Sequence, residues 1–373
     1  MYRIYILLLA SFTLFSCDKE DQEILFSGGD GTQENPYLVG SADDLDNIRH
    51  YAGIRTVYFK QVMDIDLSGF SNGMGWEPIK QFSQNYDGNG YIIYNLTINR
   101  PDEGNLGLFA DVRVRSHPVF EGNIKNVTLE DVHIIGGYEI GAIAGRNAGT
   151  LLNCKSSGKL EALGREGYIG AIGGLVGIND GTIQESYANT QIQLGERFSF
   201  FAGGLAGILN VGSVMRSFAQ GEIKVSDYEQ TRQVAGGLSG YSMPYPGTSV
   251  ITDCYAKTVI TGGNGQTMGG LLGESDGNTI IINSYAVGNI SVSGKTTGGL
   301  IGAAWGDLSV KDSYWDINTT GQEYSAGSES GIGKTTEQMK IQETFHAWDF
   351  ENIWTIEEGI SYPLLKWQTN DSN

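Results

Sequence analysis

Three stretches of the chain combine arginine with aromatic residues: LGREGYIG (163–170), LGERFSFFA (194–202) and VSDYEQTRQVA (225–235). We predict that they form a ligand-binding patch, with the candidate residues Arg165, Tyr168, Arg197, Phe198, Phe200, Tyr228 and Arg232. Arginine and aromatic side chains are enriched at the energetic centres of protein interfaces, and the same mixture suits glycans. The alternative is that the phenylalanines close a hydrophobic core while the arginines are solvated.

Other residue types that could support catalysis form no recognisable site. The four histidines and three cysteines include no His-Glu-x-x-His and no Cys-x-x-Cys spacing, which are common zinc patterns. The segment GIGKT (331–335) resembles part of a phosphate-binding loop, but Ser328 stands where the first glycine is required. We therefore expect no cofactor, no metal and no enzymatic activity. Paired carboxylates cannot be recognised from spacing in a stacked repeat, so a polysaccharide lyase or hydrolase stays open as an alternative.

The overall charge also excludes a class of partner. Lysine and arginine total 24 against 43 aspartates and glutamates, which gives a formal net charge of −19. Binding to nucleic acid depends on a basic surface, so we expect no nucleic-acid partner.

The N-terminus has the pattern of a targeting segment. Residues 1–16 contain Arg3 followed by a short apolar run, which is too short to span a bilayer and is typical of a secretory signal peptide. Leu14-Phe15-Ser16-Cys17 resembles a bacterial lipobox, which predicts lipidation of Cys17. Residues 17–28 then form an acidic linker. These features predict export through the Sec pathway and a lipid anchor in the outer membrane at the cell surface.

The elements that would position the candidate patch come from a repeat. One pentapeptide recurs from residue 141 onward: GAIAG (141), GGLVG (173), GGLAG (203), GGLSG (236), GGLLG (269) and GGLIG (298). It accounts for much of the glycine excess, because the chain has 54 glycines where about 26 would be ordinary at a usual share of ~7%.

Each repeat adds further short apolar stretches after the pentapeptide. A second motif is LLNCKS (151–156), IQESYA (183–188), VMRSFA (214–219), ITDCYA (251–256), IINSYA (281–286) and VKDSYW (310–315). With the third stretch that follows, each unit of about 31 residues predicts three short strands and an all-β, right-handed parallel β-helix (β-solenoid). A β-propeller, the alternative, would need about four strands in a repeat of ~40 residues. Glycine would permit either a positive φ or close backbone approach at the corners.

The repeat also predicts whether Cys154 and Cys254 can form a disulfide. Cys154 and Cys254 occupy the same column as Ser186, Ser217, Ser284 and Ser313, three units apart. At about 4.8 Å per rung their backbones lie ~14 Å apart, whereas a disulfide needs Cα atoms within about 7 Å. We therefore expect free thiols. Ile183, Ser186 and Tyr187 do not alternate with period two, which predicts a bulge or corner inside that strand.

These motifs resemble the GLUG family of bacterial surface proteins. GGLVGINDGTIQESYA (173–188) carries the likeness, and flanking segments such as YDGNGYIIYNLTIN (86–99) and WDFENIWTI (348–356) extend it to about residues 28–367. The resemblance implies a surface role of adhesin type and brings no catalytic residue. It divides the chain into an N-terminal cap with the first rungs (29–105), GLUG-type repeats (106–322) and a C-terminal cap (323–373). GLUG repeats also accompany some IgA-specific metallopeptidases, whose zinc-binding helix sequence this chain lacks.

Both ends of a solenoid must be covered. Ser41 could begin a helix with Leu45 and Ile48 on one face, as an N-terminal cover. At the other end, most tryptophans cluster, namely Trp305, Trp315, Trp348, Trp354 and Trp367. They predict a hydrophobic C-terminal cap, with a sugar-stacking platform as the alternative.

Together these observations predict a lipid-anchored, surface-exposed, non-catalytic protein of adhesin type. Its partner would be a glycan or a host or matrix protein, bound by the loop residues above. A carbohydrate-active β-helix enzyme and a passive spacer of the cell surface are the alternatives.

Overall fold

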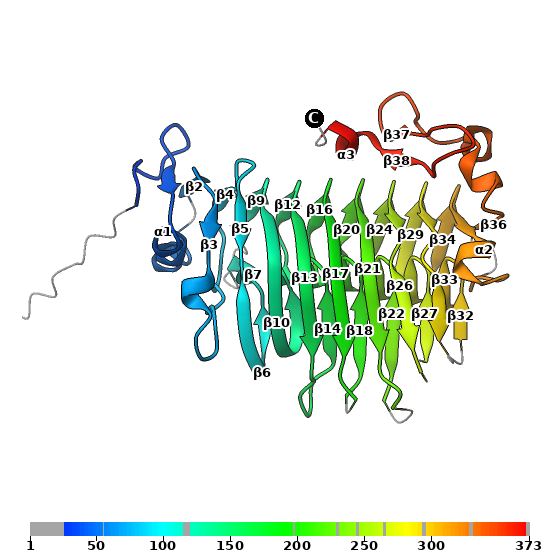
Figure 1. Cartoon of the computed structure of the whole chain (residues 1–373), viewed down its shortest axis with the longest axis horizontal. Coiled ribbons are helices and arrows are strands. Elements are labelled where there is room, and N and C mark those ends of the chain that lie inside the picture. The colour runs from blue at the N-terminus through cyan, green and yellow to red at the C-terminus, as the bar shows by residue number, and fades with distance from the viewer. Residues whose placement is uncertain are drawn as a thin grey trace, which may run out of the picture.

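The computed structural model describes residues 26–54, 56–114, 120–196, 198–228, 231–243, 246–263, 266–292, 296–327 and 331–370. The predicted signal peptide, Cys17, most of the acidic linker and Arg197 lie outside these residues. The described chain forms a parallel β-solenoid whose strands stack into three sheets along one axis (Figure 1). This confirms the predicted fold class.

Sheet A runs along the upper side of Figure 1. Its strands, in spatial order, are β1 (Tyr37–Val39), β2 (Tyr58–Gln61), β4 (Asn85–Asp87), β9 (Asn123–Lys125), β12 (Thr150–Leu152), β16 (Thr182–Gln184), β20 (Ser213–Met215), β24 (Thr248–Thr252), β29 (Asn278–Ile282) and β34 (Leu308–Lys311). From β2 to β29, residues alternate between a buried and a more exposed side chain, as a sheet with one solvated face requires. The buried column begins with Phe59, Tyr86 and Ile124, each at most 1% exposed.

Sheet B has two neighbouring columns of strands. The first contains β3 (Ile65–Asp66), β5 (Ile92–Tyr94), β6 (Thr97–Leu106), β10 (Thr128–Gly141), β13 (Lys155–Ala162), β17 (Tyr187–Leu194), β21 (Phe218–Val225), β25 (Tyr255–Ala256), β26 (Val259–Gly262), β30 (Tyr285–Ala286), β31 (Ile290–Val292), β35 (Tyr314–Asp316) and β36 (Ile332–Lys334). The second continues from the ends of β6 and β10 through β14 (Gly170–Gly173), β18 (Phe200–Gly203), β22 (Gln233–Gly236), β27 (Thr267–Gly269) and β32 (Thr296–Gly298).

Sheet C completes each turn. It contains β7 (Phe109–Val114), β8 (Phe120–Glu121), β11 (Ala144–Asn147), β15 (Val176–Asn179), β19 (Ala206–Leu209), β23 (Ser239–Ser242), β28 (Leu272–Ser275) and β33 (Ile301–Ala304). Strand pairing within the described residues is parallel except between β7 and β8 and between β37 (Trp354–Thr355) and β38 (Leu364–Leu365). The registers pair Gly173 with Gly203 and Gly203 with Gly236, so each pentapeptide occupies one rung, as the repeat predicts.

The pentapeptide splits one predicted strand into two, so a central turn has four strands rather than three. In one turn, β14 and β15 flank the bend at Gly174-Leu175, and β16 and β17 follow. The bend of the next turn packs so closely that an added Cβ at Gly207 of β19 would lie 2.9 Å from the backbone oxygen of Phe201 in β18 and 2.5 Å from the backbone nitrogen of Ile172 in β14. The pentapeptide glycines do not have positive φ. Close backbone approach, and not left-handed geometry, therefore explains why glycine recurs at these positions of each pentapeptide.

The corner predicted inside the second motif is confirmed. It lies at a column of non-glycine residues in the left-handed region, for example Glu185 (φ 49°) and Asn283 (φ 49°). The next residue of each rung points inward, and the backbone N–H of Cys154 donates to Ser186 Oγ at 2.9 Å. Cys154 and Cys254 are buried free thiols, as predicted.

Different elements cover the two ends of the solenoid. At the N-terminal end, Ser41 Oγ accepts a hydrogen bond of 3.0 Å from Asp44 N–H, which caps α1 (Ala42–Asn47), and Leu45 and Ile48 are buried as predicted. The 3₁₀ turns η1 (Ile48–Tyr51) and η2 (Ser68–Phe70) follow. At the last rung, Trp315 replaces the alanine of earlier rungs and packs on Gly299, which closes the core.

The remaining C-terminal residues run back along the flank of the solenoid (Figure 1). After α2 (Ile317–Thr320) and β36, residues 335–370 form what we call the C-terminal strap, with η3 (Gln338–Lys340), η4 (Gln342–Phe345), β37, β38 and α3 (Lys366–Asn370). The strap covers an aromatic stack on sheet B in which Phe218, Tyr255 and Tyr285 have successive ring centroids 4.7 and 5.0 Å apart.

Candidate functional site

The three arginine-containing stretches form loops on one edge of the solenoid. They connect β13 to β14, β17 to β18 and β21 to β22, and they lie below these strands in Figure 1. Backbone hydrogen bonds hold the loop ends in register, since Gly170 N–H donates to Ser199 O at 3.0 Å and Phe200 N–H donates to Arg232 O at 2.9 Å. A rigid β-scaffold therefore positions successive loops one rung apart, about 4.8 Å.

Arg165 and Tyr168 form a first cluster on this edge with Tyr138 of β10. The rings of Tyr138 and Tyr168 stack with centroids 4.3 Å apart and an interplanar angle of 19°. The guanidinium carbon of Arg165 lies 4.9 Å from the Tyr168 ring centroid and 5.9 Å from that of Tyr138. Arg165 also donates a hydrogen bond of 3.1 Å to the carbonyl oxygen of Asp102. Tyr168 remains 46% exposed, so this cluster is accessible to a partner.

Arg232 forms a second cluster of the same kind. Phe201 and Tyr241 stack with centroids 4.3 Å apart, and the Arg232 guanidinium carbon lies 5.1 and 5.5 Å from their ring centroids. Arg232 also pairs with the carboxylate of Glu274, whose side chain is only 4% exposed, while the Arg232 side chain is 43% exposed. We refer to the two clusters together as the edge surface: Tyr138, Arg165, Tyr168 and Arg232, with the buried rings of Phe201 and Tyr241 (3% and 6% exposed) supporting Arg232.

The pKa shifts in the second cluster follow from its burial. Burial raises the pKa of Tyr241 to about 12, and the hydrogen bond that its hydroxyl donates to Asp276 adds to this effect. Burial also raises the pKa of Glu274, while the Arg232 charge opposes the shift. The ion pair with buried Glu274 therefore holds one side of the Arg232 guanidinium, and the exposed part of the Arg232 side chain faces solvent.

Not all predicted residues belong to the edge surface. Phe200 is fully buried in the main core, so its assignment to the binding patch was wrong, because its position in β18 faces the interior. Phe198 is partly buried and packs against the same core, next to Gly164. Tyr228 is 43% exposed on the third loop. Arg197 falls outside the described residues.

Sequence reasoning missed Tyr138 and Tyr241. Both come from strands outside the three loops, Tyr138 from β10 and Tyr241 from β23. The signal for Tyr241 was its position in the repeat, since it lies directly after the GGLSG pentapeptide and its register partner is Ile208. A column alignment of the rungs would have placed a ring there, although it could not have shown the stacking on Phe201.

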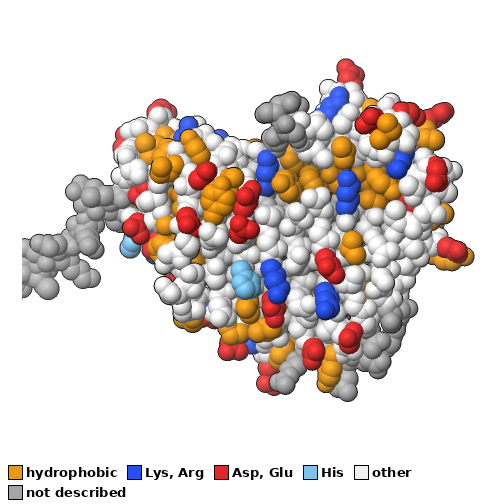
Figure 2. Space-filling model, in the orientation of Figure 1, with side chains coloured by type: hydrophobic (Ala, Val, Ile, Leu, Met, Phe, Trp, Pro, Cys, Tyr) orange, Lys and Arg blue, Asp and Glu red, His pale blue; other side chains and the backbone are white. Residues whose placement is uncertain are grey.

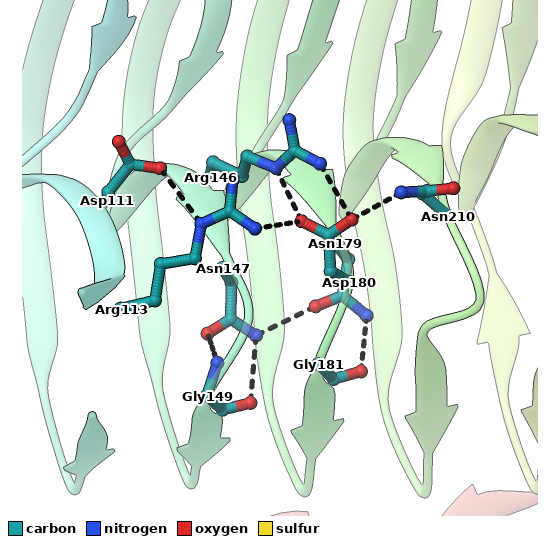
Figure 3. A network of polar contacts seen from close by, with 9 residues as sticks. All are labelled: Asp111, Arg113, Arg146, Asn147, Gly149, Asn179, Asp180, Gly181 and Asn210. Carbon is teal, nitrogen blue, oxygen red and sulfur yellow. Dashed lines mark hydrogen bonds and ion pairs between the residues drawn. The ribbon is translucent and has the colours of Figure 1, made fainter. Parts of the chain in front are cut away.

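Sheet C carries a separate polar network, shown in Figure 3. Asp180 accepts a hydrogen bond of 2.9 Å from Arg146 Nη2 and lies 3.7 Å from Arg113 Nη1. Asn210 also donates to this carboxylate. Beneath it, the side-chain amide of Asn147 donates to Asn179 Oδ1 of the next rung at 2.8 Å. Burial would lower the pKa of Arg146, but the Asp180 carboxylate holds it above its usual value. These charges satisfy one another, so the network connects rungs and stabilises sheet C.

Among the described residues, no group of three or more histidine, cysteine, aspartate or glutamate side chains could hold a metal ion. None of the helices in these described ranges has both the length and the hydropathy of a membrane-spanning segment.

Comparisons with known proteins give relatives and a related fold. No protein-family profile matches this sequence. The chain is 33% identical over 350 residues to halomucin of Haloquadratum walsbyi, a match that covers 91% of this chain and 3% of that protein. It is 38% identical over 138 residues to a protein of Evansella cellulosilytica described as a Gly-rich membrane protein, covering 35% of this chain and 15% of the relative. The chain thus spans only a small part of both relatives.

A solved structure has the same architecture. It is a protein of Bacteroides ovatus described as an immunoglobulin A1 protease, with a TM-score of 0.62, 21% identity, and coverage of 92% of this chain and 95% of that one. At this identity the likeness concerns the fold alone.

Proposed function

We propose that this chain is a lipid-anchored, surface-exposed β-solenoid of adhesin type that binds a glycan or a host or matrix protein through its edge surface. In this proposal the chain is not an enzyme, and its activity is recognition. Its residues act by presenting guanidinium groups that aromatic rings hold in place on a rigid rod, together with the exposed ring of Tyr168.

The observation that carries the proposal is the position of Arg165 over the stacked pair of Tyr138 and Tyr168. The rings hold the arginine side chain in place, so less side-chain entropy is lost when a partner binds. Arg232 repeats the arrangement over Phe201 and Tyr241, with its loop two connections further along the same edge. Arginine and tyrosine are among the residue types that dominate binding energy at interfaces.

The proposed location rests on the N-terminal sequence and on the relatives. The lipobox-like segment ending at Cys17 supports a lipid anchor. One relative, from Evansella cellulosilytica, is described as a membrane protein. The likeness of the repeats to GLUG surface proteins supports exposure at the cell surface, and the chain's net charge of −19 supports a partner other than nucleic acid.

The experiment is to probe glycan and host-protein arrays with the chain from residue 22 onward, as wild type and as an Arg165→Ala variant. The proposal expects a specific ligand whose signal the variant reduces by about tenfold, which corresponds to ~1.4 kcal/mol. Arg232→Lys serves as a second variant, because it keeps the charge beside buried Glu274 but loses the planar stacking. A ligand that both variants bind as tightly as wild type would contradict the edge assignment.

A further inference from the structure

A polar groove lies on the outer face of sheet A at its N-terminal end, away from the edge surface. It has a volume of about 500 Å³ and is lined by the loop residues Gln33, Glu34 and Pro36 and by residues of β2, β4 and β9. This volume is within the range of about 300–1,000 Å³ that is usual for sites of small ligands. Along the upper side of Figure 2, where sheet A lies, the outline dips between the N-terminal residues and the strap.

Two outward-facing columns form the floor of the groove. One column is Tyr58, Asn85 and Asn123, and the other is Lys60, Asp87 and Lys125, each residue directly opposite the next in register. The first and third rungs are about 10 Å apart. The floor therefore presents one amide or aromatic group and one charged group on each of three rungs.

The floor residues are held in place by their neighbours. Asn123 Nδ2 donates to Asn85 Oδ1 at 3.1 Å, and Lys125 Nζ lies 3.2 Å from Asp87 Oδ2. Burial would raise the pKa of Asp87, but hydrogen bonds from Asn126, Asn89 and Lys125 lower it, so the carboxylate stays ionised. No partner of the Lys60 side chain is found among the described residues.

The wall of the groove is also ordered. Asp30 accepts hydrogen bonds from the backbone N–H and the hydroxyl of Thr32, at 3.1 and 2.8 Å, which fixes the turn that carries Gln33 and Glu34. Tyr58 N–H donates to Gly31 O at 3.0 Å and ties this turn to β2. The site is thus largely formed before any ligand arrives, which reduces the cost of binding.

From this geometry we infer that the groove binds a neutral linear oligosaccharide. Sugar hydroxyls both donate and accept hydrogen bonds, so they match a lining that alternates amides, ammonium groups and carboxylates. The lining has two lysines against one aspartate and one glutamate, so it is locally neutral, while the chain carries a net charge of −19 that repels polyanions. The ring of Tyr58 offers a stacking surface for a pyranose at one end. This inference is independent of the proposed edge function.

The test is calorimetric titration of the purified full chain with cello-, xylo-, manno- and maltotetraose, and with tetragalacturonate as the acidic comparison. At least one neutral probe is expected to bind, and Asn85→Ala/Asn123→Ala should weaken it by about tenfold or more. Tyr58→Phe should keep binding and Tyr58→Ala should lose it. Thr182→Ala, on the same face two rungs beyond Asn123, is the matched control and should bind like wild type.

Several results would overturn the oligosaccharide site. Lack of binding by all four neutral probes would overturn the inference, as would binding that the double variant leaves unchanged. Tighter binding of tetragalacturonate than of the neutral probes would overturn the neutral-ligand assignment. Arg165→Ala separates this site from the edge surface, because loss of oligosaccharide binding in that variant would place the sugar at the edge instead.

Discussion

The indole nitrogen of Trp354 donates a hydrogen bond of 3.2 Å to the carboxylate of Asp253, although 101 residues separate them. Trp348 and Trp367 make equivalent bonds to the backbone carbonyls of Asp312 and Arg216, at 2.7 and 2.8 Å. Three tryptophans of the strap therefore reach three different rungs at their left-handed corners. The C-terminal tryptophans that contact the flank serve to attach the strap, and Trp305 alone among those beyond residue 300 is largely exposed, at 74%.

We predict that Trp354→Ala destabilises the fold strongly, because this side chain is fully buried between the strap and the aromatic stack. The free energy of unfolding should fall by about 3–5 kcal/mol, as for other large buried aromatic residues. Trp305→Ala is the matched control and should change stability by less than about 0.5 kcal/mol. Urea denaturation of both variants measures the difference, and equal losses would show that the strap is not docked as described.

A second prediction concerns the pentapeptide glycines. Gly207→Ala should lower the free energy of unfolding by about 1–3 kcal/mol or more, because the added Cβ would meet the backbone of β14 and β18. Gly69→Ala should be nearly neutral, since nothing lies within 4 Å of its Cβ position. Thermal unfolding of the two variants tests the claim. Tolerance of alanine at Gly207 would mean that the two halves of the bend are not in contact.

A third prediction is a loss of stability at alkaline pH that depends on Cys154. Burial raises the pKa of its thiol from 9.0 to about 12. Because the folded state holds this proton more tightly than the unfolded state, its contribution is fully present below about pH 9 and is lost as the pH rises towards 12. Cys154→Ser should therefore show a shallower decline in unfolding free energy above pH 9 than wild type. Identical slopes in the two proteins would refute this origin.

A fourth prediction concerns the anchor. Cells that express the full chain and grow with a labelled fatty acid should incorporate label into the wild-type protein and not into Cys17→Ala. The physical reason is that an acyl chain attached at Cys17 would bury its methylene groups in the bilayer and so add membrane affinity. Either an unlabelled wild type or a labelled Cys17→Ala variant would refute lipidation at this residue.

Much of the architecture was predictable because each rung repeats the same local constraints. The spacing of pentapeptides such as GGLVG and GGLAG predicted the register that pairs Gly173 with Gly203. The column shared by Cys154 and Ser186 predicted separate buried thiols. Ser41 as a helix start, with Leu45 and Ile48 on one face, predicted the covering helix α1. Because residues at the same position of successive repeats pair with one another, the repeat spacing predicts long-range contacts. The fold could therefore be predicted from this one sequence.

What could not be predicted depends on packing between segments that do not repeat. The tight bend that divides β14 from β15 follows from backbone contact, and sequence alone left positive φ as an equal explanation. Phe200 and Phe201 are adjacent and both buried, yet Phe200 enters the main core while Phe201 joins a second buried cluster next to Arg232, which only the register decides. The groove was missed because Tyr58, Asn85 and Asn123 lie in early rungs that lack the repeated motif.

The edge surface is the central claim, and amide hydrogen exchange of the chain with and without its array-identified ligand tests it most directly. Exchange reports local opening, so a bound partner should slow it where contact is made. The account predicts slower exchange in the loops at residues 163–169 and 226–232, with little change in the strap. Protection confined to other parts of the solenoid, with both loops unaffected, would contradict it.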